Sequence, residues 1–263
     1  ATATTLEGPW TDQGTFLVGW HKMAVLVDSA GAAVRVGGHY HAYAVSFGRS
    51  NSGKHIAHFT ARHLAGPWTR GSTVVPVGHA GASDAAATDA PFALYQSGKV
   101  YLWYMGSPAV PHPRYGLAQR LHLTAGTSPD GPLTFPRIVL DPSSNAANWD
   151  HGWIGGVQVV KRPDGTWVMI YNAGRARPLT VASEPEPSLS GMATARSLAG
   201  PWTRDTRNPY TSVVNGQPGI LENTNIWRTF LILNRQMGRW YLFYNTGPAG
   251  QERITFARQV LGD

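Results

Sequence analysis

Three acidic residues stand directly ahead of short apolar segments, in places that turn chemistry does not explain. They are Asp89, Asp150 and Glu222. By contrast, Asp130 and Asp164 lie in turn motifs, where hydrogen bonds to nearby backbone account for an aspartate. Convergent carboxylates can supply the acid, base or nucleophile that breaks a glycosidic bond. We predict Glu222 as general acid and Asp89 or Asp150 as base or nucleophile.

Aromatic and polar side chains surround the same three positions and the start of a fourth apolar segment. Indole rings can pack against the apolar face of a sugar, while imidazole, amide and guanidinium groups can bind its polar substituents. We therefore expect a substrate-binding set made of Trp20, His21, His151, Trp153, Asn223, Trp227 and Arg228. No compact metal-ligand spacing such as His-Glu-x-x-His occurs, so we expect neither a metal nor another cofactor.

The elements that must position these residues come as a repeat. Residues 89–106, 156–174 and 227–247 each read as an apolar strand, a tight turn and an aromatic-rich strand. A second repeat is the short segment Gly-Pro-Trp-Thr, or Gly-Pro-Leu-Thr, which begins at Gly8, Gly66, Gly131 and Gly200. The spacing is close to even when the chain is closed into a circle, which indicates a ring of repeated units.

This pattern predicts an all-β fold and, within it, a β-propeller that forms one domain over residues 1–263. Four blade repeats are readable, and five blades are the alternative. The last repeat ends without its own Gly-Pro-Trp-Thr segment, while the copy at Gly8 has no strand before it. We expect the N-terminal strand to complete the last blade and so close the ring. The four apolar segments would then line the axis and bring their polar starts to one funnel.

Composition and net charge limit the classes of binding partner that we expect. With 42% hydrophobic and only 14% charged residues, the chain can bury a large core, and no apolar run approaches the 18 residues of a membrane span. The net charge is +7, yet no run of five basic residues occurs, so we expect an acidic polysaccharide as partner and not nucleic acid. The start at Ala1 suits a mature secreted bacterial chain, and we expect a monomer.

The segment from Asp89 to Gly106, with the Gly-Pro segments that follow it, resembles a blade of the β-propeller glycoside hydrolases of the family-43, family-32 and family-130 type. The resemblance implies a glycosidase acting on an oligo- or polysaccharide. It matches Asp89 to the aspartate that opens the second blade and, in family 43, tunes and orients the catalytic acid. In family 43 an aspartate stands at the start of blade one, where this chain has His21. Family 43 also has a glutamate at the start of blade three, and this chain has none there. The chain therefore resembles a divergent member.

The sequence leaves the reaction open between three classes. The first is hydrolysis of a furanose-containing or acidic glycan by carboxylates in an axial pocket. The second is a lectin-like propeller that binds sugar without cleaving it, at several similar sites between blades. The third is a lyase or cyclase that uses His21 or His151 with a carboxylate in the same pocket.

Overall fold

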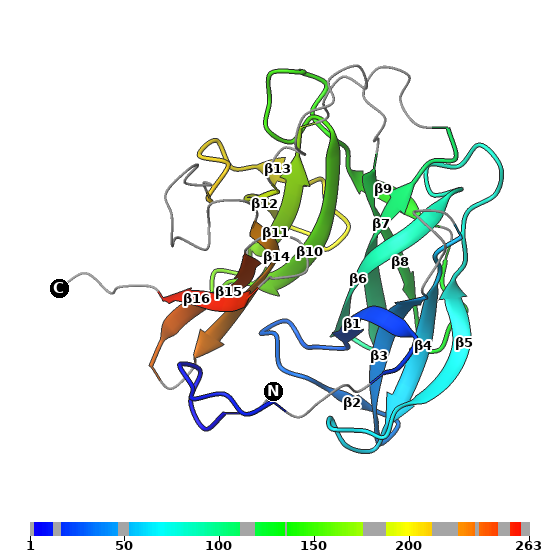
Figure 1. Cartoon of the computed structure of the whole chain (residues 1–263), viewed down its shortest axis with the longest axis vertical. Coiled ribbons are helices and arrows are strands. Elements are labelled where there is room, and N and C mark those ends of the chain that lie inside the picture. The colour runs from blue at the N-terminus through cyan, green and yellow to red at the C-terminus, as the bar shows by residue number, and fades with distance from the viewer. Residues whose placement is uncertain are drawn as a thin grey trace.

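The computed structural model of the chain describes residues 3–12, 17–46, 53–110, 119–134, 136–175, 188–211, 226–234, 237–246 and 253–258. Over these residues all regular structure is β-strand, and no helix is long and apolar enough to cross a membrane. The strands form four antiparallel sheets around a common centre (Figure 1). The prediction of an all-β propeller is confirmed, with four blades and not five.

Each blade follows the chain outward from its innermost strand. The first sheet contains β1 (Trp20–Val25), β2 (Arg35–Val36), β3 (His39–Ser46), β4 (Ile56–Ala61) and β5 (Thr69–Val75). The second contains β6 (Ala87–Gln96), β7 (Lys99–Ser107), β8 (Arg120–Gly126) and β9 (Arg137–Leu140). The third contains β10 (Trp153–Lys161), β11 (Trp167–Gly174), β12 (Leu189–Ala195) and β13 (Thr203–Arg204). The fourth contains β14 (Ile226–Asn234), β15 (Arg239–Thr246) and β16 (Arg253–Arg258).

The hydrophobic core lies between neighbouring sheets. Neighbouring blades pack face to face, and β11, which lies between the second and fourth blades, is buried along its whole length. One cluster joins the first and second sheets around Tyr43 and Leu102, and another joins the second and third around Trp103 and Met169. This packing holds β1, β6, β10 and β14 in place around the axis.

The Gly-Pro-Trp-Thr repeats have one conformation in all four copies. Their glycines have φ between 82° and 91°, a region that residues with a Cβ rarely adopt, and the Gly-Pro bonds are cis. In the first and third blades the segment leads directly into the outer strand, β5 or β13. The repeat thus marks the entry to the blade's outer edge.

The N-terminal copy of this segment packs against the last sheet, which lies next to it in Figure 1. Tyr241 Oη in β15 donates a hydrogen bond to Glu7 Oε1 at 3.0 Å. The Trp10 ring packs edge-on against Phe243, with 6.0 Å between ring centroids. These contacts join residues from the two ends of the chain, but the last sheet has three strands among the described residues and none is N-terminal, so completion of the last blade by an N-terminal strand stays a prediction.

We predict that Trp10→Ala lowers the free energy of unfolding by about 1–2 kcal/mol, because it removes an aromatic pair and part of its buried area. Denaturant unfolding measures the loss. Val18→Ala is the control, since Val18 is 90% exposed and should leave stability unchanged. Equal stability of the Trp10→Ala variant and the wild type would show that the N-terminal segment does not fasten the ring.

Candidate active site

All four innermost strands break their hydrogen-bond register at the same point. The break follows His21 in β1, Asp89 in β6, Gly155 in β10 and Trp227 in β14. The next residue has a left-handed backbone in every blade, with φ of 51° at Lys22, 50° at Ala90, 55° at Gly156 and 40° at Arg228. Such bulges redirect side chains and are common beside functional sites. The four positions are equivalent by fold but differ in chemistry.

Asp89 is held in a cluster of cations at this level of the axis. The residue is 4% exposed. Its Oδ2 atom accepts hydrogen bonds from Lys22 Nζ at 2.7 Å and from Lys54 Nζ at 3.2 Å, and its Oδ1 atom accepts one from the Ala90 backbone N–H at 2.6 Å. Asp89 is therefore a buried carboxylate with two ammonium partners.

The electrostatics of the cluster keep Asp89 ionised. Burial alone would raise the pKa of this carboxyl group, but Lys22, Lys54 and the Ala90 N–H outweigh burial, and the pKa lies below its ordinary value. Burial lowers the pKa of Lys22 and of Arg228, and the charge of Asp89 opposes the change in both. Burial also lowers the pKa of His21, which favours its neutral imidazole.

A cavity of about 360 Å³ opens at the bulges. It is lined by Lys22, Ala90, Met105, Trp153, Gly156, Asn172, Arg228 and Asn245. All four left-handed residues contribute to it, so the cavity lies on the axis. Sterics also require a glycine at position 156, because a Cβ on Gly156 would come within 2.7 Å of Asn172 Oδ1. Gly174 makes similar room for the Trp153 indole, which a Cβ would approach to 2.6 Å.

Three buried polar atoms of residues that line the cavity have no hydrogen-bond partner among the described residues. They are Arg228 Nη2, Asn172 Oδ1 and Asn245 Oδ1. Asn172 is fixed by its Nδ2 atom, which donates to Ser190 Oγ at 3.0 Å and to Ile226 O at 3.2 Å. Buried polar groups are almost always paired in folded proteins, so atoms of this kind around a cavity indicate a ligand site. The cavity offers a cationic donor and two amide acceptors.

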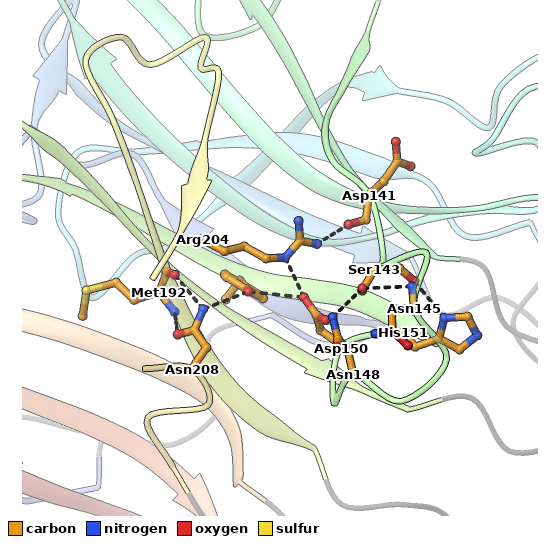
Figure 2. Close-up of polar contacts among 10 residues, drawn as sticks. Asp141, Ser143, Asn145, Asn148, Asp150, His151, Met192, Arg204 and Asn208 are labelled. Carbon is orange, nitrogen blue, oxygen red and sulfur yellow. Dashed lines mark hydrogen bonds and ion pairs between the residues drawn. The ribbon is translucent and has the colours of Figure 1, made fainter. Parts of the chain in front are cut away.

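Asp150 lies away from this cavity, in a network at the edge of the third blade (Figure 2). Its Oδ2 atom accepts a hydrogen bond from Arg204 Nε on the outer strand β13 at 2.7 Å, and Tyr171 Oη lies 3.5 Å away. Arg204 Nη2 also donates to the carbonyl of Asp141. The residue is 1% exposed. The structure therefore does not bring Asp150 together with Asp89.

Asp84 is the counterpart of Asp150 in the second blade. Each lies five residues before the bulge of its blade, and each has a tyrosine beside it, since Tyr104 Oη donates to Asp84 Oδ2 at 2.7 Å. Glu222 has the same offset from Trp227 in the sequence. The repeat thus contains an acid at this place in three blades.

The other predicted residues divide between the axis and the blades. Trp153 and Arg228 line the cavity, and His21 is close enough for the charge of Asp89 to act on its pKa. Trp20 instead packs inside the first blade, with its ring 5.2 Å from Phe59. His151 accompanies Asp150, and its Nδ1 atom is 2.7 Å from the carbonyl of Ser143 (Figure 2).

Glu222 and Asn223 lie outside the described residues, as does the side chain of Trp227, so their roles stay predictions. The sequence reasoning missed Lys54, Asn172 and Asn245 as site residues. A signal for the two asparagines was present, because both follow a tyrosine in the repeated Tyr-Asn segments of the second strands. Within the described parts of the chain, no group of three His, Asp or Glu residues could hold a metal ion.

Comparison with known proteins supports the fold alone. No protein-family model matches the chain, and no curated protein matches it. Among solved structures, the family 117 glycoside hydrolase Zg3597 of the marine bacterium Zobellia galactanivorans is similar over 98% of this chain and 71% of its own, with 17% identity and a TM-score of 0.67. The inulosucrase of Halalkalicoccus jeotgali is similar over 97% and 68%, with 16% identity and a TM-score of 0.63. The chain thus has the propeller fold of solved carbohydrate-active enzymes.

From its surroundings we predict that Asp150 is structural. Asp150→Asn and Arg204→Gln should each lower the free energy of unfolding by about 1–3 kcal/mol, since each leaves the other partner unpaired, and partial exposure of Arg204 limits the loss. In a double-mutant cycle the two losses should not add. Asp141→Asn, in an exposed ion pair with Arg120, is the control and should have a much smaller effect. Additive losses would contradict this assignment.

Proposed function

We propose that the protein is a glycoside hydrolase that acts on a furanose-containing or acidic glycan in the axial cavity. The observation that carries the proposal is Asp89, a buried and ionised carboxylate whose neighbour Ala90 and ion-pair partner Lys22 both line the cavity. An ionised carboxylate can activate water or attack the anomeric carbon. The fold supports the proposal, since the similar structures described above are carbohydrate-active enzymes.

The cavity has groups suited to a sugar. The Trp153 indole forms part of its wall and can pack against a sugar ring. The Asn172 and Asn245 carbonyl oxygens can accept hydrogen bonds from sugar hydroxyls, which are good donors. These contacts would fix the ring so that its anomeric carbon faces the carboxylate, and such positioning accounts for a large part of catalysis.

The second catalytic group must protonate the leaving oxygen. We propose Glu222 for this role, with His21, the counterpart of Asp89 in the first blade, as the competing candidate. Because burial lowers the pKa of His21, its imidazole is mostly neutral at neutral pH, which makes it a weak candidate for an acid and leaves it free to act as a base. Substitution separates the two, because loss of the true acid lowers the rate most for substrates whose leaving group is poor.

We predict that the purified protein releases sugar from at least one member of a panel of arabinan, xylan, fructan and uronate-rich glycans. Asp89→Asn and Glu222→Gln should each lower kcat/KM by about 10²–10⁴-fold, the usual contribution of an acid or base. Asp164→Asn, at an exposed turn, should leave the rate unchanged. If the released sugar is the same with Asp89→Asn and with Glu222→Gln, the catalytic assignment is wrong.

The pH dependence gives a separate prediction. Lys22→Met removes the nearest cation from Asp89 while burial remains, so the pKa of Asp89 rises and a smaller fraction is ionised at a given acidic pH. The acidic limb of kcat/KM against pH should therefore move to higher pH. Lys99→Met, at the exposed first residue of β7, serves as control. A limb that stays in place would show that Asp89 does not set it.

Two other functions give different results in the same assays. A lectin-like propeller would bind several sugars per chain, whereas the four bulge positions here differ in chemistry and meet at one cavity, so calorimetry should give one site. A lyase would use the neutral His21 as base and would leave a carbon–carbon double bond that absorbs ultraviolet light. Mass and absorbance of the product distinguish elimination from hydrolysis.

A further inference from the structure

The first and last blades place long cations where the middle blades have small residues. Of the four left-handed positions, two carry Ala90 and Gly156, and two carry Lys22 and Arg228. A long side chain in this backbone conformation is strained, and strain of this kind is concentrated at functional sites. The bulge directs both cations toward the axial cavity, which they line.

The charges at the axis do not balance among the described residues. Lys22, Lys54 and Arg228 are three cations, and the one carboxylate described beside them, Asp89, pairs with the two lysines. Both lysines are directed to the same oxygen, Asp89 Oδ2. No described acid forms an ion pair with Arg228. The axis therefore carries more positive than negative charge around a partly closed cavity.

Arg228 is the group for which this imbalance matters most. Its Nη2 atom is buried and has no hydrogen-bond partner among the described residues. A buried guanidinium without an anion is unfavourable, and a planar guanidinium matches a carboxylate through two parallel hydrogen bonds. A neutral sugar could satisfy one N–H group but would leave the charge uncompensated. An anionic ligand would accept hydrogen bonds from the guanidinium and also compensate its charge.

The neighbouring acceptors define what else the ligand must carry. Asn172 Oδ1 and Asn245 Oδ1 line the same cavity and need hydrogen-bond donors, which a simple carboxylate does not have. A uronic acid has both features, a carboxylate for Arg228 and hydroxyls for the two amides. A small inorganic or organic anion has only the first, and a neutral furanose has only the second.

We propose that the axial cavity is a binding site for a uronic acid residue, whose carboxylate Arg228 binds with Lys22 beside it and whose hydroxyls donate to Asn172 and Asn245. The proposal gives a substrate class to the proposed hydrolase and rests on that function for the reaction, but it concerns binding and is tested without catalysis.

The test uses single sugars, which contain no glycosidic bond and cannot be consumed. Glucuronate and galacturonate are titrated calorimetrically into the wild-type protein and compared with glucose and galactose, which have a hydroxymethyl group in place of the carboxylate. We expect each uronate to bind about ten- to a hundredfold more tightly than its neutral counterpart, the ratio that a hydrogen bond to a charged group supplies. Equal affinities would overturn the proposal.

Variants then assign the carboxylate to Arg228. Arg228→Gln should remove most of the preference for uronate, and Arg228→Lys should restore only part of it, because an ammonium lacks the planar fork. Arg137→Gln changes the net charge equally at an exposed strand position and should leave the preference intact. A preference that survives Arg228→Gln would overturn the assignment. If that variant does not fold, the wild-type comparison still decides the proposal.

Two further ligands identify the chemistry. Acetate tests whether any carboxylate binds, and galactose 6-sulfate tests whether any anionic sugar binds. Binding of acetate as tight as that of uronate would overturn the role of the two asparagines. Binding of the sulfated sugar tighter than that of uronate would overturn the assignment of a carboxylate as the anionic group. Uronate binding without release of sugar from any glycan of the panel would support this site and contradict the proposed function. Release of sugar from a neutral glycan without uronate binding would support the proposed function and contradict this site.

Discussion

The break in hydrogen-bond register near the start of each inner strand is the constraint on which the site depends. A regular strand would alternate its side chains between the two faces of the blade. One extra residue with a left-handed backbone instead lines the axial cavity in all four blades. Because the blades are packed against one another through their buried central strands, the four redirected positions are held at one level.

The four bulge positions share one backbone conformation but carry different side chains, which explains how a repeated fold has a single site. The second blade contributes the carboxylate Asp89, and the first and last contribute cations. The third contributes Gly156, whose missing side chain leaves room for Asn172. A fully repeated set of residues would give four equal and opposed groups around the axis. The asymmetry gives the cavity different chemical groups on its different sides, so the proposed sugar would have one favourable orientation in it.

The sequence was sufficient for the fold because its signals are local. Turn residues, alternating apolar strands and the Gly-Pro-Trp-Thr segments recur at near-even spacing, and each carries its own structural meaning. The site was harder to predict, since position before a strand does not say which way a side chain points. Asp89 and Asp150 look alike in sequence, yet Asp89 lies at the bulge, whereas Asp150 lies five residues earlier and pairs with Arg204. Lys54 could not be found by any repeat, because it reaches the axis from the start of the third strand of its sheet, β4.

The contact between the N-terminal segment and β15 has a consequence for how the molecule is made. Glu7 and Trp10 are synthesised more than 200 residues before their partners Tyr241 and Phe243. The first three blades can fold as they emerge, while the N-terminal segment must wait for the fourth. Arg228 belongs to that fourth blade. Completion of the ring and assembly of the cavity are therefore the same event, and a chain without its fourth blade has no complete axial cavity.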